Sequence, residues 1–114
     1  MQIPGEAVRL RIHIGANDTY QSEPLVDAIV RRARQAGLAG ATATRGITGY
    51  GESTRVHRID LVLSHDLPIV IEIIDEAAKI ETFLPTLQAM IGTGLVTREA
   101  VTVLRYGATV SGQT

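Results

Sequence analysis

The N-terminal part of the chain alternates between apolar and polar residues. In the segment VRLRIHI, residues 8–14, four aliphatic side chains alternate with Arg9, Arg11 and His13. A period of two places the aliphatic residues on one face of an extended strand and the polar residues on the other. We therefore predict a strand with one face on a hydrophobic core.

The pattern then changes to helical spacing. From Glu23 to Ala36 apolar residues recur every three or four positions, Pro24 lies in the first turn, and Gly37 follows the last apolar position. Proline is favoured in the first helical turn and glycine just beyond the end of a helix. These signals predict a helix over Glu23–Ala36, capped by Ser22.

Three extended segments occupy the middle of the chain. The segment ATATRGIT at 41–48 is rich in threonine, HRIDLVLS at 57–64 alternates between polar and apolar residues, and PIVIEIID at 68–75 is apolar at nearly every position. Because β-branched residues favour pleated, half-buried surfaces, we predict a strand in each segment.

A second helical pattern follows residue 75, and Asp75 is placed to cap it. Pro85 lies within the pattern, where proline removes a hydrogen bond and collides with the preceding turn. We therefore expect a kink or a break between Thr82 and Leu84. The segment AVTVLRY, Ala100–Tyr106, is the last predicted strand, and no periodicity marks the tail at 107–114.

These elements give a specific fold class. Their order is that of the ferredoxin-like βαββαβ plan, an α+β fold in which both helices cover one face of an antiparallel sheet. With 114 residues, the chain is predicted to form a single domain, 1–114, with its core from about residue 6 to residue 106.

The segment at 68–75 carries apolar residues on both faces. Ile69, Ile71 and Ile73 share one face, whereas Val70 and Ile74 flank a glutamate on the other. Helices on one side leave the second face uncovered, so we predict that another copy of the chain covers it in a closed symmetric contact. The alternative is that the two flanking residues are exposed strand formers. Residues able to pair in such a contact are Arg9, Arg11, His13, Asp60 and Glu72.

Composition narrows the functional classes. The net charge is −1 and charges of both signs are interspersed, so the chain lacks the basic surface that nucleic acid requires, and we predict no nucleic-acid partner. No cysteine is present, which excludes a disulfide scaffold and thiolate chemistry. Arg9 and Arg11 interrupt the N-terminal apolar stretch, so we expect neither a signal peptide nor a membrane span, and a cytoplasmic location.

A glycine cluster lies in RGITGYGEST, residues 45–54. The spacing of Gly46, Gly49 and Gly51 is that of neither the dinucleotide fingerprint nor the P-loop, since no lysine follows and no helix begins there. These glycines can still bulge a strand, adopt positive φ, and present backbone N–H groups to an anion. The alternative is a mobile hairpin connection that binds nothing.

The order of motifs resembles a known family. The segments GATATRGITGYG, DLP, PIVIEIID, FLPTL and GTGLVTREAVTVLRY are together similar to the PII-like family catalogued as domain of unknown function 190, over about Glu6–Tyr106. A remoter similarity links the chain to the PII nitrogen-signalling proteins. Gly49-Tyr50-Gly51 resembles their glycine-aromatic-glycine at the base of the T-loop, and Leu67-Pro68 resembles the Leu-Pro that closes it.

This resemblance implies a function. PII proteins are trimers that bind adenine nucleotides in clefts between subunits and contact a transporter or enzyme through the T-loop. The chain would then be a homotrimeric signalling protein and not an enzyme, with no required cofactor, AMP, ADP or ATP as its effector, and a membrane channel or transporter as its partner. The effector loop would span Glu52–Leu67, and the cleft would include the connection Thr97–Glu99. The implied ligand-binding residues are Ala41, Thr42, Arg45, Gly49, Tyr50, Gly51, Arg98 and Arg105, and the implied loop residues include Glu52, Ser53, Thr54, Arg55 and His57.

Two departures from the PII pattern concern phosphate binding. Ile69 stands where PII proteins have a lysine, and residues 97–100 replace their Gly-Asp-Gly-Lys phosphate loop. The loss of both lysines favours a ligand with fewer phosphates than a triphosphate, such as a monophosphate, or a different anion. The residues able to supply positive charge are Arg45, Arg55, Arg98 and Arg105, each with the alternative role of a solvated or intersubunit ion-pair residue.

Other chemistry is weakly indicated. His13, His57 and His65 lie in different elements without short ligand spacing, so we predict no metal site. Ser53 and Thr54 beside His57 lack the rigid support that nucleophilic catalysis requires. The alternatives left open are a small enzyme or a metal-binding protein like CutA using the same clefts, and a structural trimer whose loop docks a partner constitutively.

Overall fold

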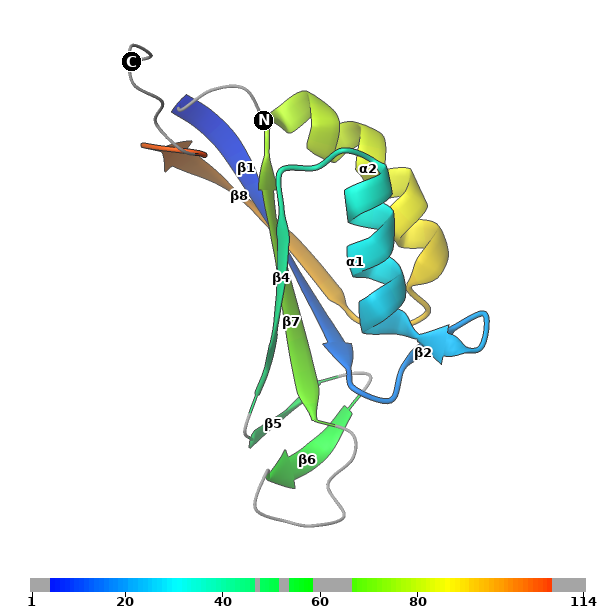
Figure 1. Ribbon diagram of the computed structural model, residues 1–114. Coiled ribbons are helices and arrows are strands. Elements are labelled where there is room, and N and C mark those ends of the chain that lie inside the picture. The colour runs from blue at the N-terminus through cyan, green and yellow to red at the C-terminus, as the bar shows by residue number, and fades with distance from the viewer. Residues whose placement is uncertain (1–4, 47, 52–53, 59–66, 108–114) are drawn as a thin grey trace.

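The computed structural model describes residues 5–46, 48–51, 54–58 and 67–107. Two helices cover one face of a four-stranded antiparallel sheet, with the strand order β4-β7-β1-β8 (Figure 1). This order confirms the ferredoxin-like α+β fold. In chain order the described elements are β1 Gly5–Gly15, β2 Thr19–Tyr20, β3 Glu23–Pro24, α1 Leu25–Gln35, β4 Ala41–Arg45, β5 Thr48–Gly51, β6 Thr54–Arg58, β7 Pro68–Asp75, α2 Ala77–Met90 and β8 Leu95–Val103.

The core lies between the helices and one face of the sheet. The alternation of β1 and β7 buries every second residue, and the register sets Leu10 opposite Ile73 and Ile12 opposite Ile71. Burying one such side chain contributes about 1.5–3 kcal/mol, so these central pairs account for much of the stability. The helices contribute the buried residues Leu25, Ala28, Ile29, Ala33, Ile80, Phe83, Leu87 and Met90.

The first helix starts later than predicted. Gln21 and Ser22 have φ of 50° and 69° and form the two-residue turn of the β2–β3 hairpin. Positive φ at both central positions is typical of a type I′ hairpin turn. The prediction that Ser22 caps the helix was therefore wrong, because its backbone serves this turn. Helix α1 begins at Leu25, whose N–H donates to the Asp18 carbonyl oxygen at 2.8 Å.

The second helix is continuous. Helix α2 runs through Pro85 from Ala77 to Met90, so the predicted break is absent. The predicted cap was also wrong, because Asp75 ends β7 and the helix is preceded by Glu76, with no side-chain capping bond. The Asp75 carboxylate is fully buried and accepts hydrogen bonds from the backbone N–H groups of Ala39 and Glu76.

The last strand is shifted from its predicted range. Strand β8 spans Leu95–Val103 rather than Ala100–Tyr106, and it pairs with β1 from His13↔Leu95 to Gly5↔Val103. Residues 95–100 are exposed on both faces of the strand, so their sequence does not alternate between apolar and polar residues and does not indicate where the strand begins.

The glycine-rich segment lies in a separate two-stranded hairpin. Strand β5 pairs with β6, and the register shifts between Gly49 and Gly51, which confirms the predicted strand irregularity. Figure 1 shows this hairpin beyond the end of the main sheet. The predicted strand at 57–64 is described only at His57 and Arg58, and its remainder lies outside the described residues.

Candidate functional site

The face of the sheet opposite the helices is open in the single chain. Val70, Glu72 and Ile74 of β7 lie on this face and remain partly exposed in the single chain, and the prediction that another copy covers them stays a prediction. Strand β8 forms one edge and leaves Leu95 55% exposed, and beyond the strand Leu104 is 86% exposed. The helices cannot cover this face, since they pack on the other one (Figure 1).

A pocket of about 280 Å³ opens on this face, at the end of the sheet where β4 begins and β7 ends. Residues from both strands, from the end of β8, from the loop ahead of β4 and from the segment after β8 meet there. We call it the open-face pocket, and its lining residues are Ala39, Gly40, Thr42, Glu72, Ile74, Val103, Arg105 and Tyr106.

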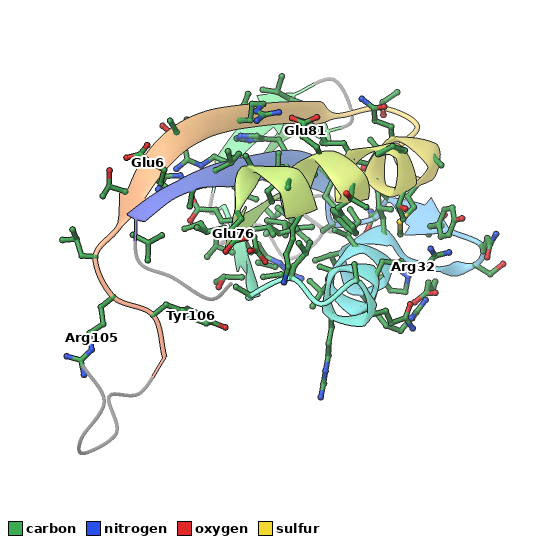
Figure 2. All side chains as sticks on the ribbon, turned by 90° about the horizontal axis from the view of Figure 1, so that it is seen from above. Glu6, Arg32, Glu76, Glu81, Arg105 and Tyr106 are labelled. Carbon is green, nitrogen blue, oxygen red and sulfur yellow. The ribbon has the colours of Figure 1, made fainter. Side chains whose placement is uncertain are left out.

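Two hydrogen bonds to one residue hold the loop wall of this pocket. The Ala39 N–H donates to Asp75 Oδ2 at 2.8 Å, and the Tyr106 hydroxyl donates to the Ala39 carbonyl oxygen at 3.1 Å. Figure 2 shows the Tyr106 side chain directed from the C-terminal segment toward the body of the fold. The loop and the C-terminal segment are therefore tied together around the pocket.

A row of charges crosses the open face beside the pocket. Arg11 Nε donates to Glu72 Oε2 at 2.9 Å, and Arg9 pairs with Glu99 directly across from it on β8. The hydrogen bond from Arg9 lowers the pKa of the Glu99 carboxyl, with help from the nearby Arg11 charge. In the single chain the partners of both arginines lie within the same sheet, and the prediction that these residues can pair in a contact between copies stays a prediction.

The predicted ligand-binding residues fall into separate groups. Thr42 and Arg105 both line the open-face pocket, although Figure 2 shows the Arg105 side chain directed away from the sheet. Ala41 alternates with Thr42 and packs against the core instead. Gly49 and Gly51 lie in the hairpin beyond the opposite end of the sheet (Figure 1).

Arg98 is separated from this pocket by the sheet itself. It stands opposite Leu10, on the helix side, and forms an ion pair with Glu81 of α2. Residues 97–99 are part of β8, so the prediction that they form a connection was wrong. One chain alone therefore does not bring Arg98 and Thr42 to the same site.

The remaining predicted residues are partly described. Arg45 ends β4 and is exposed, and Tyr50 lies in β5. Thr54, Arg55 and His57 form part of β6, so this portion of the predicted effector loop is a strand. Glu52 and Ser53 lie outside the described residues.

Gly46 is required for packing rather than for positive φ. A Cβ at this position would lie 2.8 Å from Cγ of Pro68, and the Gly46 N–H donates to the Pro68 carbonyl oxygen at 2.8 Å. Its backbone is outside the left-handed region. The predicted role in a phosphate cradle therefore gains no support from its conformation.

Sequence reasoning missed several residues of the pocket. The sequence assigns Glu72 only to a strand and to pairing, Ala39 lies outside the family-like motifs, and Val103 and Tyr106 lie within such a motif but are not among the implied ligand-binding residues. The period-two pattern of β7 does place Glu72 and Ile74 on one face, but it carries no signal for a pocket there. The arrival of the C-terminal segment beside them is a tertiary feature.

Neither a metal cluster nor a membrane-spanning helix occurs in the part of the chain that the structure describes. No group of three or more histidine, aspartate or glutamate side chains is gathered there as metal ligands would be. No described helix is both long enough and apolar enough to cross a bilayer. The predicted cytoplasmic location stays a prediction.

Comparison with protein families gives one match over most of the chain. The model of DUF190, described as uncharacterized ACR, matches residues 7–103. A UPF0166 protein of Aquifex aeolicus strain VF5 is 38% identical over 96 residues, covering 83% of this chain and 90% of the relative. The UPF0166 protein MJ1524 of Methanocaldococcus jannaschii is 34% identical over 89 residues, covering 76% and 82%.

Solved structures with a similar fold are PII-like. CPII from Thiomonas intermedia K12, a nitrogen regulatory PII-like protein bound to ADP, AMP and bicarbonate, has a TM-score of 0.59 at 18% identity, covering 88% of this chain and 90% of CPII. A CPII structure with ADP, AMP and acetate has a TM-score of 0.55 at 18% identity, covering 90% and 93%. At these identities the likeness concerns the fold, which is PII-like.

Proposed function

Because this chain belongs to the DUF190 family and has a PII-like fold, we propose that it is a regulatory protein that binds an adenine nucleotide and signals to a partner protein. The observation that carries this proposal is the open-face pocket, in which three strands, a loop and the C-terminal segment converge. Its volume of about 280 Å³ is near the lower end of small-molecule sites, which usually begin at roughly 300 Å³.

We propose that the ligand binds between subunits of a homotrimer. The open sheet face and the exposed residues Leu95, Val96, Leu104 and Tyr106 provide apolar surface for a second copy. A cleft between subunits would also explain why the predicted ligand-binding residues lie at opposite ends of the sheet in one chain, some at the pocket and others in the glycine hairpin. The pocket of one subunit would face the glycine hairpin of its neighbour, and the backbone N–H groups of Gly49 and Gly51 would bind phosphate.

The segment from Glu52 to Leu67 is proposed to contact the partner, which the family resemblance suggests is a membrane channel or transporter. The segment starts at the end of β5 and stops just before β7, so a change at the hairpin reaches the sheet directly. A ligand controls this segment only if it binds one of its conformations more tightly than another.

A short phosphate chain is favoured. In the described part of the chain no lysine lies beside the pocket, and Arg98 is already paired with Glu81 on the far face of the sheet. CPII was solved with ADP and AMP bound, and we propose AMP or ADP rather than ATP as the effector here.

The test is calorimetric titration of the protein with AMP, ADP, ATP and cyclic nucleotides, with and without magnesium, combined with light scattering. Saturable binding of one nucleotide to a trimer is expected. The Gly49→Ala and Gly51→Ala variants should bind more weakly, because a Cβ would hinder the approach of phosphate to the backbone. A trimer that binds none of these nucleotides would refute the proposed effector.

A further inference from the structure

Strand β4 forms one edge of the main sheet, and in the described part of the chain no strand pairs with its outer side. At the end of this strand the Gly46 N–H donates to the Pro68 carbonyl oxygen at 2.8 Å. Because hydrogen-bonded and non-hydrogen-bonded pairs alternate in an antiparallel ladder, every second residue of β4 directs its N–H and C=O groups away from β7. These residues are Ala41, Ala43 and Arg45. The edge therefore presents a row of backbone donors and acceptors.

This edge lacks the features that usually protect a sheet edge from other chains. Edge strands commonly carry charged side chains, a proline or a bulge. Residues 41–44 are only alanine and threonine, and the register with β7 is regular from Ala41 to Arg45. The opposite edge strand, β8, carries Arg98 and Glu99 in its middle. Strand β4 is therefore the edge that more readily accepts an added strand.

A narrow apolar pocket adjoins the start of β4. Helix α1 packs against this strand (Figure 1), and the pocket of about 220 Å³ lies between the helix, the strand and the loop that joins them. We call it the edge pocket. Its aliphatic lining residues are Val30, Ala33, Leu38 and Ala41. Small-molecule sites usually begin at roughly 300 Å³, so the edge pocket suits one branched aliphatic side chain rather than a whole ligand.

Arg34 adds an exposed positive charge to the edge pocket. In the described part of the chain its side chain has no hydrogen bond or ion pair, whereas Arg31 of the same helix is held by Glu23 through two contacts of 2.6 Å. A guanidinium binds a carboxylate through two parallel hydrogen bonds. An apolar pocket beside this guanidinium therefore fits an aliphatic residue that carries a carboxylate.

We propose that the edge of β4 binds the C-terminus of a partner protein as an added strand. The last side chain of the partner fills the edge pocket, and the terminal carboxylate pairs with Arg34. An internal acidic residue serves less well, because successive side chains of a strand point to opposite faces. At a chain end the carboxylate and the aliphatic side chain belong to one residue.

The position of the edge pocket sets the direction of the added strand. The pocket lies at the start of β4, so a chain that ends there runs antiparallel to this strand. The surface is separate from the segment Glu52–Leu67, and the inference does not depend on nucleotide binding.

The test uses fluorescence anisotropy and a labelled, threonine-rich peptide of about six residues, long enough to pair along Ala41–Arg45. The peptide ends in leucine with a free carboxylate. We expect saturable binding to the wild-type protein. Amidation of the terminus should weaken it about tenfold or more, because hydrogen bonds between charged groups are lost. A final glycine in place of leucine should also weaken binding, since the edge pocket then holds no side chain.

Two arginine variants test the carboxylate contact. Arg34→Ala should bind the free and the amidated peptide equally, because the group that distinguishes them is gone. The matched control is Arg32→Ala, which removes the same charge from the same helix at a residue that does not line the edge pocket. This control should keep the wild-type preference for the free carboxylate.

A proline variant tests the strand pairing. Ala43→Pro removes a backbone N–H that points away from β7, so the sheet keeps its own hydrogen bonds. This variant should bind the peptide about tenfold or more weakly than the wild-type protein. Ala43→Ser keeps the N–H and should bind as the wild-type protein does. Thermal unfolding of each variant verifies the fold.

The outcomes that would overturn the proposal are distinct. One is a wild-type protein that binds no leucine-ending peptide up to about 1 mM. Another is an Arg34→Ala variant that still prefers the free carboxylate. A lower oligomer mass for Ala43→Pro in light scattering would show that a second copy of the chain occupies this edge, and it would overturn the proposal as well.

Discussion

The buried Asp75 carboxylate offers the sharpest test of how the fold positions the pocket. Its Oδ2 accepts a hydrogen bond from the Ala39 N–H at 2.8 Å, and its Oδ1 accepts one from the Glu76 N–H at 2.6 Å. The residue has no exposed surface. Asp75 thus joins the end of β7 to the loop that lines the open-face pocket. We predict that Asp75→Asn destabilises the protein and weakens nucleotide binding together.

The size of the destabilisation follows from the two carboxylate oxygens of Asp75, each of which accepts one backbone hydrogen bond. An asparagine has one side-chain oxygen for one of these N–H groups and presents its NH₂ group to the other N–H, so one buried backbone donor loses its acceptor. Losing a charge-assisted hydrogen bond costs about 1.5–3 kcal/mol. For a domain of this size that corresponds to a decrease in Tm of roughly 5–15 °C.

The assay is urea unfolding at fixed protein concentration, followed by circular dichroism, because binding between copies would make the midpoint concentration-dependent. The control is Glu76→Ala, which removes the neighbouring carboxylate but leaves the backbone N–H that Asp75 binds. Its helix-terminal position makes a change of less than about 1 kcal/mol the expectation. Equal unfolding free energies for the two variants would refute the anchoring role of Asp75.

Two further predictions concern the strand β8. Gly94 has a φ of 151° and its added Cβ would lie 2.7 Å from the His13 carbonyl oxygen, so Gly94→Ala should lower the unfolding free energy by about 1–3 kcal/mol. Gly92→Ala, with nothing within 4 Å, should change it by less than about 0.5 kcal/mol, and equal urea midpoints would contradict this reasoning. The Arg9 hydrogen bond depresses the pKa of Glu99 below its ordinary value of 4.5, so the stabilisation is present above that pH and is lost as the pH falls through the folded-state pKa. The difference in unfolding free energy between the wild-type protein and Glu99→Gln should therefore shrink on acidification, and a constant difference down to the acid transition would disprove the coupling.

Much of the fold could be predicted because local pattern and burial agree. The alternation in β1 and the apolar faces of β7 fixed which residues reach the core, and the order of strands and helices identified the ferredoxin-like plan. The glycines were also expected to be able to bulge a strand, and the register does shift between Gly49 and Gly51. In each case the pattern of residues close together in the sequence was sufficient for the prediction.

Where the predictions failed, contacts between distant segments decided the structure. Ser22 has the composition of a helix cap but lies in a hairpin turn, and Asp75 binds a loop N–H 36 positions away in the sequence instead of capping α2. Strand β8 begins at Leu95 because β1 offers it partners for hydrogen bonds and for ion pairs, although its own residues there are exposed. Backbone pairing of this kind leaves no periodic pattern.

The sequence by itself determined the fold class and the family, because these depend on periodicity and on local motifs, whereas the ligand-binding residues that the resemblance implies stay predictions. Only the tertiary structure decided that Arg98 and Thr42 lie on opposite faces of the sheet, and that Glu72 and Tyr106 meet at one pocket. The physical reason is strand register. A shift of one residue moves every side chain of a strand to the other face, and register is set by pairing between strands that are far apart in the chain.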